Sequence, residues 1–203
     1  MEEELYFYEY DQDGYYCYPD SNTLKNKLNI LDAEELKQVE REITALRTAQ
    51  IMVEGIDGKF DFDHLKAIHR FLFQDIYKWA GEIRNVNISK GNQFCLFQYI
   101  EEQMNQIFMQ LKQENYLRNC HDLEEFGKRL AYYLSEMNAI HPFREGNGRV
   151  QRLFLEELAA FNGYRLDFLK ISSEEMLDAS QKGFYLDYSL MEDLIIRALS
   201  RKE

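Results

Sequence analysis

The chain has 203 residues, 45% of them apolar and 30% charged, so its length suits a single domain and its composition excludes a disordered protein. The 10 glycines and 2 prolines make up about half the usual share, which excludes collagen-like and turn-rich all-β proteins and favours long helices. The net charge of -12 opposes general affinity for nucleic-acid phosphates and anionic membranes, so we expect neither as a partner.

The N-terminal sequence and the cysteines indicate a compartment. The first residues carry no basic segment followed by an apolar one, and no stretch approaches the roughly 18 apolar residues that span a bilayer. The three cysteines, at positions 17, 95 and 120, are an odd number at wide spacing, which fits neither a disulfide framework nor a zinc cluster. We therefore expect a protein of a reducing cytosol.

Helical patterns dominate the chain after its first residues. Residues 1–31 are tyrosine-rich and turn-like, so we expect an extended lead-in there, followed by one domain over residues 32–203. Capping pairs and apolar residues at steps of three and four predict helices over about 32–53, 62–77, 100–111, 122–140 and 149–162, and two shorter helices, one after Ser172 and one over 190–199.

A different period appears between Ile83 and Phe97. Val86 and Ile88 alternate with polar residues, and a Lys-Gly-Asn-Gln turn sequence follows. This alternation predicts a short β-hairpin.

The segment from His141 to Arg152 lies between two predicted long helices and reads His-Pro-Phe-Arg-Glu-Gly-Asn-Gly-Arg-Val-Gln-Arg. The proline ends the preceding helix at His141. Gly146, Asn147 and Gly148 tolerate positive φ and stand directly before a helix N-terminus, so their N–H groups can converge on one anion. We therefore predict an anion-binding loop.

Charged groups accompany this loop. Arg149 and Arg152 share one face of the first helical turn, where cations oppose the helix dipole and need an anion such as phosphate. Glu145 adds an oxygen ligand suited to Mg²⁺ on nucleotide phosphates, and His141 can accept a proton near neutral pH. Each residue alone is more often structural, as we expect for the apolar Phe143, but together they predict phosphoryl or nucleotidyl transfer.

The segment matches in full the motif of the Fic-domain family, His-Pro-Phe-x-Asp/Glu-Gly-Asn-Gly-Arg-x-x-Arg. The chain also resembles Fic domains over residues 23–28, 64–69, 75–84 and 87–91. This resemblance implies an all-α fold, a Fic-type helical bundle with a short β-hairpin flap. It further implies a Mg²⁺-dependent enzyme that moves AMP from ATP to a hydroxyl side chain of a target protein.

The resemblance also implies roles for individual residues. His141 would be the general base that deprotonates the target Ser, Thr or Tyr hydroxyl, and Glu145 would hold Mg²⁺ at the phosphates. The anion hole would be formed by Gly146, Asn147 and Gly148. The β- and γ-phosphates would be bound by Arg149 and Arg152.

The hairpin would act as a flap that aligns the target segment by strand-like pairing, through Ile88, Ser89, Lys90 and Gly91. For Lys90 a second interpretation stays open, that of a solvated turn lysine.

Two departures within the family are informative. Phosphorylating relatives carry a lysine where this chain has Gly148, so AMP transfer is favoured. Many members inhibit themselves through a Ser/Thr-x-x-x-Glu segment, whereas no Ser or Thr of this sequence has Glu four positions on.

The lead-in resembles Fic domains of toxin–antitoxin pairs and type IV secretion effectors. We therefore expect a small separate inhibitory protein as a partner, and a location in the bacterial cytoplasm or in a target cell's cytosol.

Two other functions remain open. The chain is alternatively a non-catalytic helical interaction module whose loop only binds a nucleotide or anion, or a Fic fold that transfers another nucleotide, a phosphate group or phosphocholine. Other candidate sites are weak: His64 and His69 are five apart and do not predict a zinc site, and Cys95 lacks a visible activating partner.

Overall fold

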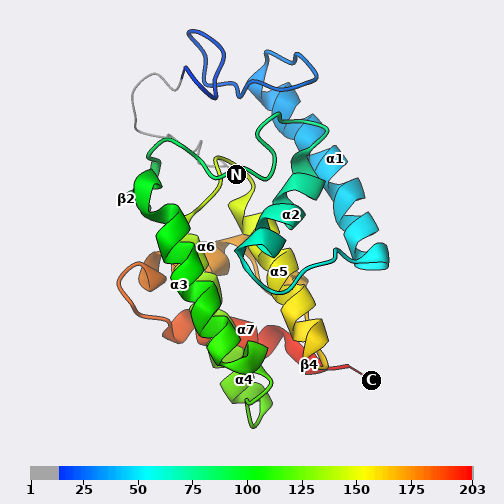
Figure 1. The fold of residues 1–203 in the computed structure, drawn as a ribbon, viewed down its shortest axis with the longest axis vertical. Coiled ribbons are helices and arrows are strands. Elements are labelled where there is room, and N and C mark those ends of the chain that lie inside the picture. The colour runs from blue at the N-terminus through cyan, green and yellow to red at the C-terminus, as the bar shows by residue number, and fades with distance from the viewer. Residues whose placement is uncertain (1–13, 203) are drawn as a thin grey trace.

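A computed structural model describes residues 14–202; residues 1–13 and 203, including that part of the predicted lead-in, lie outside the described region. The described chain is mostly helical and contains a short β-hairpin, which confirms the predicted fold class (Figure 1). Its α-helices are α1 (Ala33–Glu54), α2 (Phe62–Phe73), α3 (Ile100–Gln113), α4 (Leu123–Ile140), α5 (Asn147–Phe161), α6 (Ser173–Gly183) and α7 (Ser189–Ala198).

Side-chain caps fix where the helices begin. Asp32, Asp61 and Asp122 each accept a hydrogen bond from the backbone N–H three residues on, at the starts of α1, α2 and α4. Ser172 and Glu175 form a reciprocal capping box at α6. These are the polar residues whose spacing marks helix starts in the sequence, so the starts follow from local chemistry.

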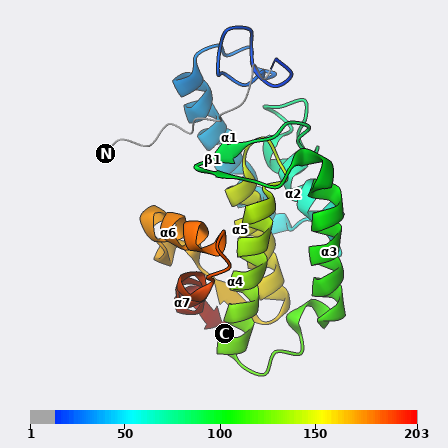
Figure 2. The same ribbon diagram turned by 90° about the vertical axis from the view of Figure 1, so that its left-hand side faces the viewer.

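Helices α4 and α5 form the centre of the bundle. Helix α5 contacts α2 and α4, and α4 also contacts α3, α6 and α7. Figure 2 shows α3 on one side of this pair and α6 and α7 on the other. Fully buried apolar side chains fill the space between the helices, among them Leu65, Leu130, Phe143, Val150 and Leu158. The loop between α4 and α5 is therefore anchored at the core of the molecule.

Two small antiparallel sheets complete the fold. The flap hairpin pairs β1 (Ser89–Lys90) with β2 (Asn92–Gln93) around Gly91, whose φ of +72° suits a residue without a side chain (Figure 2). A second sheet pairs β3 (Tyr164–Leu166) with β4 (Leu199–Arg201). The second sheet is missing from the sequence prediction because strands of three residues are too short to show a period of two.

Some boundaries differ from those predicted. Helix α2 ends at Phe73 and not at Tyr77, and α5 begins at Asn147, two residues before the predicted start. Gly146 causes the earlier start, because its left-handed backbone (φ 79°) turns the chain directly into the helix. Across residues 14–202, none of the helices combines the length and apolarity that crossing a bilayer requires.

Candidate active site

The loop between α4 and α5, together with the first two turns of α5, holds most of the predicted site residues. His141 is the C-cap of α4 and adopts a left-handed conformation (φ 53°, ψ 64°), a common way to end a helix, and Pro142 follows it. The side chain of Asn147 clamps the loop: its Oδ1 accepts from the Phe143 N–H at 2.9 Å, and its Nδ2 donates to the Phe143 carbonyl at 2.8 Å. Asn147 thus shapes the loop with its side chain and leaves its backbone at the start of α5.

The N-terminus of α5 has the features of an anion site. Its N-cap, Gly146, contributes no side-chain cap, so the first-turn N–H groups meet the end of the helix dipole without that competition. A Cβ at Gly146 would lie 2.2 Å from the Phe73 ring, so only glycine fits there. Arg152 is close by, because a Cβ at Gly148 would lie 3.2 Å from its Nη1.

The imidazole of His141 is held in one tautomer. Its Nδ1–H donates to the carbonyl of Asn138 at 3.2 Å, which leaves Nε2 as the atom that accepts a proton. The ring stacks on Phe94, with centroids 3.9 Å apart and planes 18° apart. Burial lowers the pKa of His141 to about 3, and the positive charges of Arg84 and Lys90 act in the same direction. The imidazole is therefore neutral at physiological pH.

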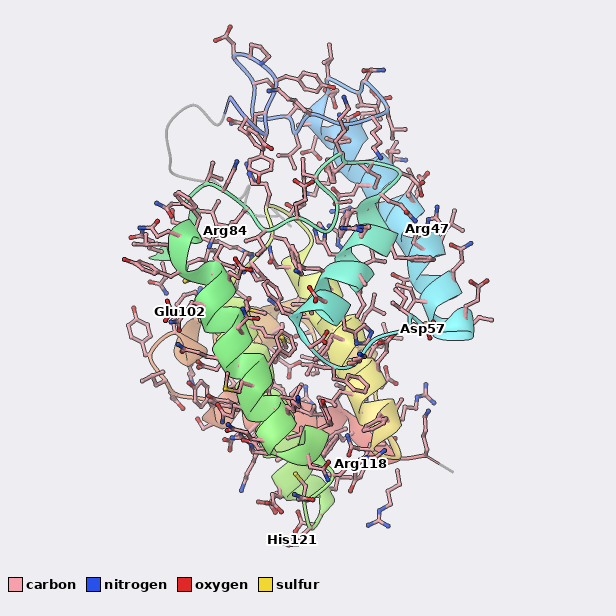
Figure 3. All side chains as sticks on the ribbon, in the orientation of Figure 1. Arg47, Asp57, Arg84, Glu102, Arg118 and His121 are labelled. Atoms are coloured by element: carbon pink, nitrogen blue, oxygen red, sulfur yellow. The ribbon has the colours of Figure 1, made fainter. Side chains whose placement is uncertain are left out.

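Arg84 ties the flap to the end of α4, and sequence reasoning missed this role. Its guanidinium donates to the carbonyls of His141 (2.7 Å), Ile140 (3.1 Å) and Val86 (2.6 Å), and also to that of Cys95. Arg84 is 1% exposed, and its own backbone N–H donates to the Pro142 carbonyl. Figure 3 shows it in the upper half of the molecule, far from His121 at the lower end. In the sequence, the only signal for Arg84 is that it lies in the stretch 75–84, which resembles Fic domains.

The flap lies over this end of the bundle. Ile88 is buried, while Ser89 and Lys90 are half-buried and form β1. The Phe94 N–H donates to the Ile88 carbonyl, so the stacked ring on His141 is part of the hairpin's base. The structure therefore brings the predicted flap residues to the same end of the bundle as the predicted base.

Arg149 differs from the expectation that it needs an external anion. Arg149 donates from Nη2 to the Glu40 carboxylate at 2.6 Å and from Nη1 to Thr44 Oγ1 at 3.1 Å. Burial raises the pKa of Glu40, and Arg149 opposes that shift. A protein carboxylate thus already pairs with Arg149. This pair was not predictable from the sequence, because Glu40 belongs to a helix far away in the chain.

Glu145 has an environment that suits a single metal ligand. Its Oε1 accepts from the Gly146 N–H at 2.8 Å and faces Arg149 Nη2 at 3.4 Å. Among the described residues, no group of three or more His, Cys, Asp or Glu side chains surrounds a possible cation position. Because Mg²⁺ on a nucleotide takes only one or two protein carboxylates, this donor set fits a metal held chiefly by phosphate oxygens.

His69 supports the α4–α5 loop from α2, and it is a second residue whose role was not predicted from the sequence. Its Nε2–H donates to the Glu145 carbonyl at 3.1 Å, and its Nδ1 accepts from the Gly81 N–H at 2.7 Å. The ring stacks on Phe143, with centroids 4.0 Å apart. Burial lowers the pKa of His69 to about 3, so the ring is neutral, and backbone groups engage both of its nitrogens.

Comparisons with known proteins identify the family. Residues 59–159 match the model of the Fic/DOC family. The chain is 42% identical over 186 residues to the protein adenylyltransferase VbhT of Bartonella schoenbuchensis, covering 91% of this chain but 39% of that protein. It is also 42% identical over 190 residues to the probable protein adenylyltransferase Fic of Salmonella typhimurium, covering 91% of this chain and 92% of the relative.

Solved structures resemble the fold over nearly its whole length. The N-terminal Fic domain of a Bartonella quintana effector, with bound ADP, superposes with a TM-score of 0.88 at 29% identity, covering 94% of this chain and 96% of that one. BepC of Bartonella tribocorum, with bound AMPPNP, gives 0.88 at 26% identity and covers 93% and 98%. The resemblance seen in the sequence is confirmed, and the chain belongs to the Fic/DOC family.

Proposed function

We propose that this protein is a Mg²⁺-dependent protein adenylyltransferase that moves AMP from ATP to a side-chain hydroxyl of a target protein. The observation that supports this most is a neutral histidine, with Nε2 as its proton acceptor, at the start of a loop that leads into a helix N-terminus without a side-chain cap. The relatives named as adenylyltransferases and those solved with ADP or AMPPNP support the same activity.

In the proposed reaction, His141 takes the proton of the target hydroxyl. The hydroxyl oxygen forms a bond to the α-phosphorus of ATP, the bond from that phosphorus to the bridging oxygen breaks, and pyrophosphate leaves. Backbone N–H groups of Gly146, Asn147 and Gly148 stabilise the charge that develops on the phosphate oxygens.

Charged side chains would position the nucleotide. Arg149 and Arg152 would bind the β- and γ-phosphates, and Glu145 would hold Mg²⁺. When bound, the metal would neutralise phosphate charge and orient the leaving group.

The flap would align the target. The backbone of Ile88, Ser89, Lys90 and Gly91 would pair with an extended segment of the target, as exposed strand edges pair with peptides. Pairing there would bring the hydroxyl to the end of the bundle where Phe94 stacks on His141.

We also propose a separate inhibitory protein as a partner. These 203 residues contain no Ser or Thr followed four positions later by Glu. A small helical protein that carries such a segment would place its glutamate against Arg152 and turn ATP away from its productive pose. Two locations fit such a pair: the bacterial cytoplasm, or a target cell's cytosol, to which the likeness to effectors described as VirB-translocated points.

Labelled ATP tests the function. Incubation of the protein with a cell lysate, Mg²⁺ and ATP labelled on the α-phosphate should transfer label to protein. Transfer of γ-label alone would indicate a kinase. The absence of both, with nucleotide still bound, would indicate the interaction module.

A further inference from the structure

A buried ion pair links α1 to the anion-binding loop. Glu40 is 7% exposed, and its Oε1 lies 2.6 Å from Nη2 of Arg149, 109 positions away in the chain. The side chain of Arg149 is itself only 26% exposed. A pair that is withdrawn from water costs desolvation free energy and constrains both side chains, unlike an exposed ion pair, which contributes little. Its position beside the phosphate site therefore calls for a functional explanation.

Three neighbouring groups hold this pair in one arrangement. The buried hydroxyl of Tyr77 donates to the other oxygen of Glu40. Thr44, one turn along α1, accepts from Nη1 of Arg149, and the guanidinium lies over the Phe73 ring at 4.8 Å. Phe73 is the ring that also requires glycine at position 146. Arg149 is thus held by α1, by α2 and by the residues just after α2.

A further neighbour, Glu145, competes for the same guanidinium. Nη2 of Arg149 lies 2.6 Å from Glu40 but 3.4 Å from Glu145. Without the charge of Glu40, the nearest carboxylate to Arg149 would be the one assigned to Mg²⁺. A closer pair between Arg149 and Glu145 would lower the affinity of that carboxylate for a metal, because an ion-paired ligand must first be released.

We propose that Glu40 is a positioning residue, which keeps Arg149 away from Glu145 so that the carboxylate of Glu145 stays available to Mg²⁺ and Arg149 meets the phosphates in one pose. This inference rests on the proposed function of the site. It assigns α1 a part in nucleotide binding through Arg149.

Calorimetric titration of Mg²⁺-ATP tests the proposal without an activity assay. Glu40→Gln removes the charge but keeps the size, and should weaken Mg²⁺-ATP binding on the order of ten-fold, the range typical of residues that orient metal ligands. The loss should shrink as Mg²⁺ is raised. Glu42→Gln, an exposed change of the same charge on the same helix, should bind like the parent.

A double-mutant cycle separates positioning from general stability. In an Arg149→Met background, Glu40→Gln should cause no further loss, because its effect passes through Arg149. An equal loss in both backgrounds, or unchanged or tighter binding by Glu40→Gln alone, would overturn the proposal. If Glu40→Gln does not fold, Thr44→Val gives the same comparison. It should lower the affinity for Mg²⁺-ATP a few-fold in the parent and cause no further loss in the Arg149→Met background.

The parent protein provides the remaining control. Parent protein that binds no Mg²⁺-ATP would contradict the proposed function and this inference with it. Parent protein that binds Mg²⁺-ATP while Glu40→Gln binds equally well would contradict this inference alone.

Discussion

The two ends of the α4–α5 loop are held by different kinds of contact. At its start, His141 is fixed by the carbonyl of Asn138 and by the ring of Phe94. The nearby guanidinium of Arg84 donates hydrogen bonds to backbone carbonyl oxygens. Just past its end, in the first turn of α5, Arg149 is fixed by the carboxylate of Glu40 at 2.6 Å, while Glu145 lies farther away at 3.4 Å. The base is held by dipoles and stacking, whereas the phosphate side is held by ion pairs.

This difference separates two chemical requirements within one loop. A general base must be uncharged to accept a proton, and a carboxylate next to His141 would favour the charged imidazolium. Phosphate binding needs fixed positive charge, which a buried carboxylate can hold in place. The following variants test whether the two sides are as separate as the contacts indicate.

The largest effect is expected from His141→Ala. Because the imidazole acts on the incoming hydroxyl and not on the phosphates, transfer should fall by about 10³-fold while Mg²⁺-ATP affinity stays within a few-fold. Transfer assays and calorimetry on the same sample measure both. His121→Ala, which changes an exposed histidine at the other end of the molecule, is the control (Figure 3). Retained transfer would remove His141 from the role of base.

Glu145→Gln should come next, with transfer reduced by about 10- to 100-fold at low Mg²⁺. The amide loses the charge that holds the metal while the anion-binding backbone stays, so raised Mg²⁺ should restore part of the rate. The rate as a function of Mg²⁺ concentration is the measurement. A variant with the parent's rate and metal dependence would make Glu145 a loop carboxylate only.

Arg84→Met should affect the base side more than the phosphate side. Four backbone carbonyls lose a charged donor, so we expect the free energy of unfolding to fall by about 3 kcal/mol. Transfer at a temperature where the variant is folded should fall about ten-fold, because the flap and His141 lose their common anchor, while ATP affinity changes less. Thermal melts with Arg165→Met as an exposed control check the first part, and an equal loss of affinity and transfer would argue against the separation.

The smallest effect at neutral pH is expected from Phe94→Leu, whose effect should depend on pH. Burial holds the pKa of His141 at about 3, so the base is neutral above that pH and the parent rate should show no titration near pH 6.5. Removing the stacked ring admits water and raises this pKa toward 6.5, so the variant should lose activity as the pH falls from 8 to 5.5. Phe97→Leu is the matched control, and identical pH profiles would mean that Phe94 does not set the pKa.

Much of the fold was predictable because its signals are local. Asp32, Asp61 and Asp122 mark helix starts by their own hydrogen bonds, and Pro142 ends α4. Gly146 has the positive φ that its residue type allows, but Asn147 and Gly148 already belong to α5 and do not precede it as predicted.

The residues that the sequence missed act over long distances. Glu40 meets Arg149 from 109 positions away, and Arg84 meets His141 from 57 positions away. No periodicity in a sequence shows which buried carboxylate or guanidinium will meet a distant loop, because that pairing is decided by helix packing. His69 illustrates the same limit: its spacing from His64 spoke against a metal site but did not indicate its bond to the Glu145 carbonyl.

The most direct test of the account is a crystal structure with Mg²⁺ and a non-hydrolysable ATP analogue. We expect the phosphates at the N-terminus of α5, with the α-phosphorus as the phosphorus atom nearest Nε2 of His141 and the metal on Glu145. A nucleotide bound in the reverse direction, with its γ-phosphorus nearest His141, would contradict AMP transfer. Phosphates bound away from α5 would contradict the assignment of the site.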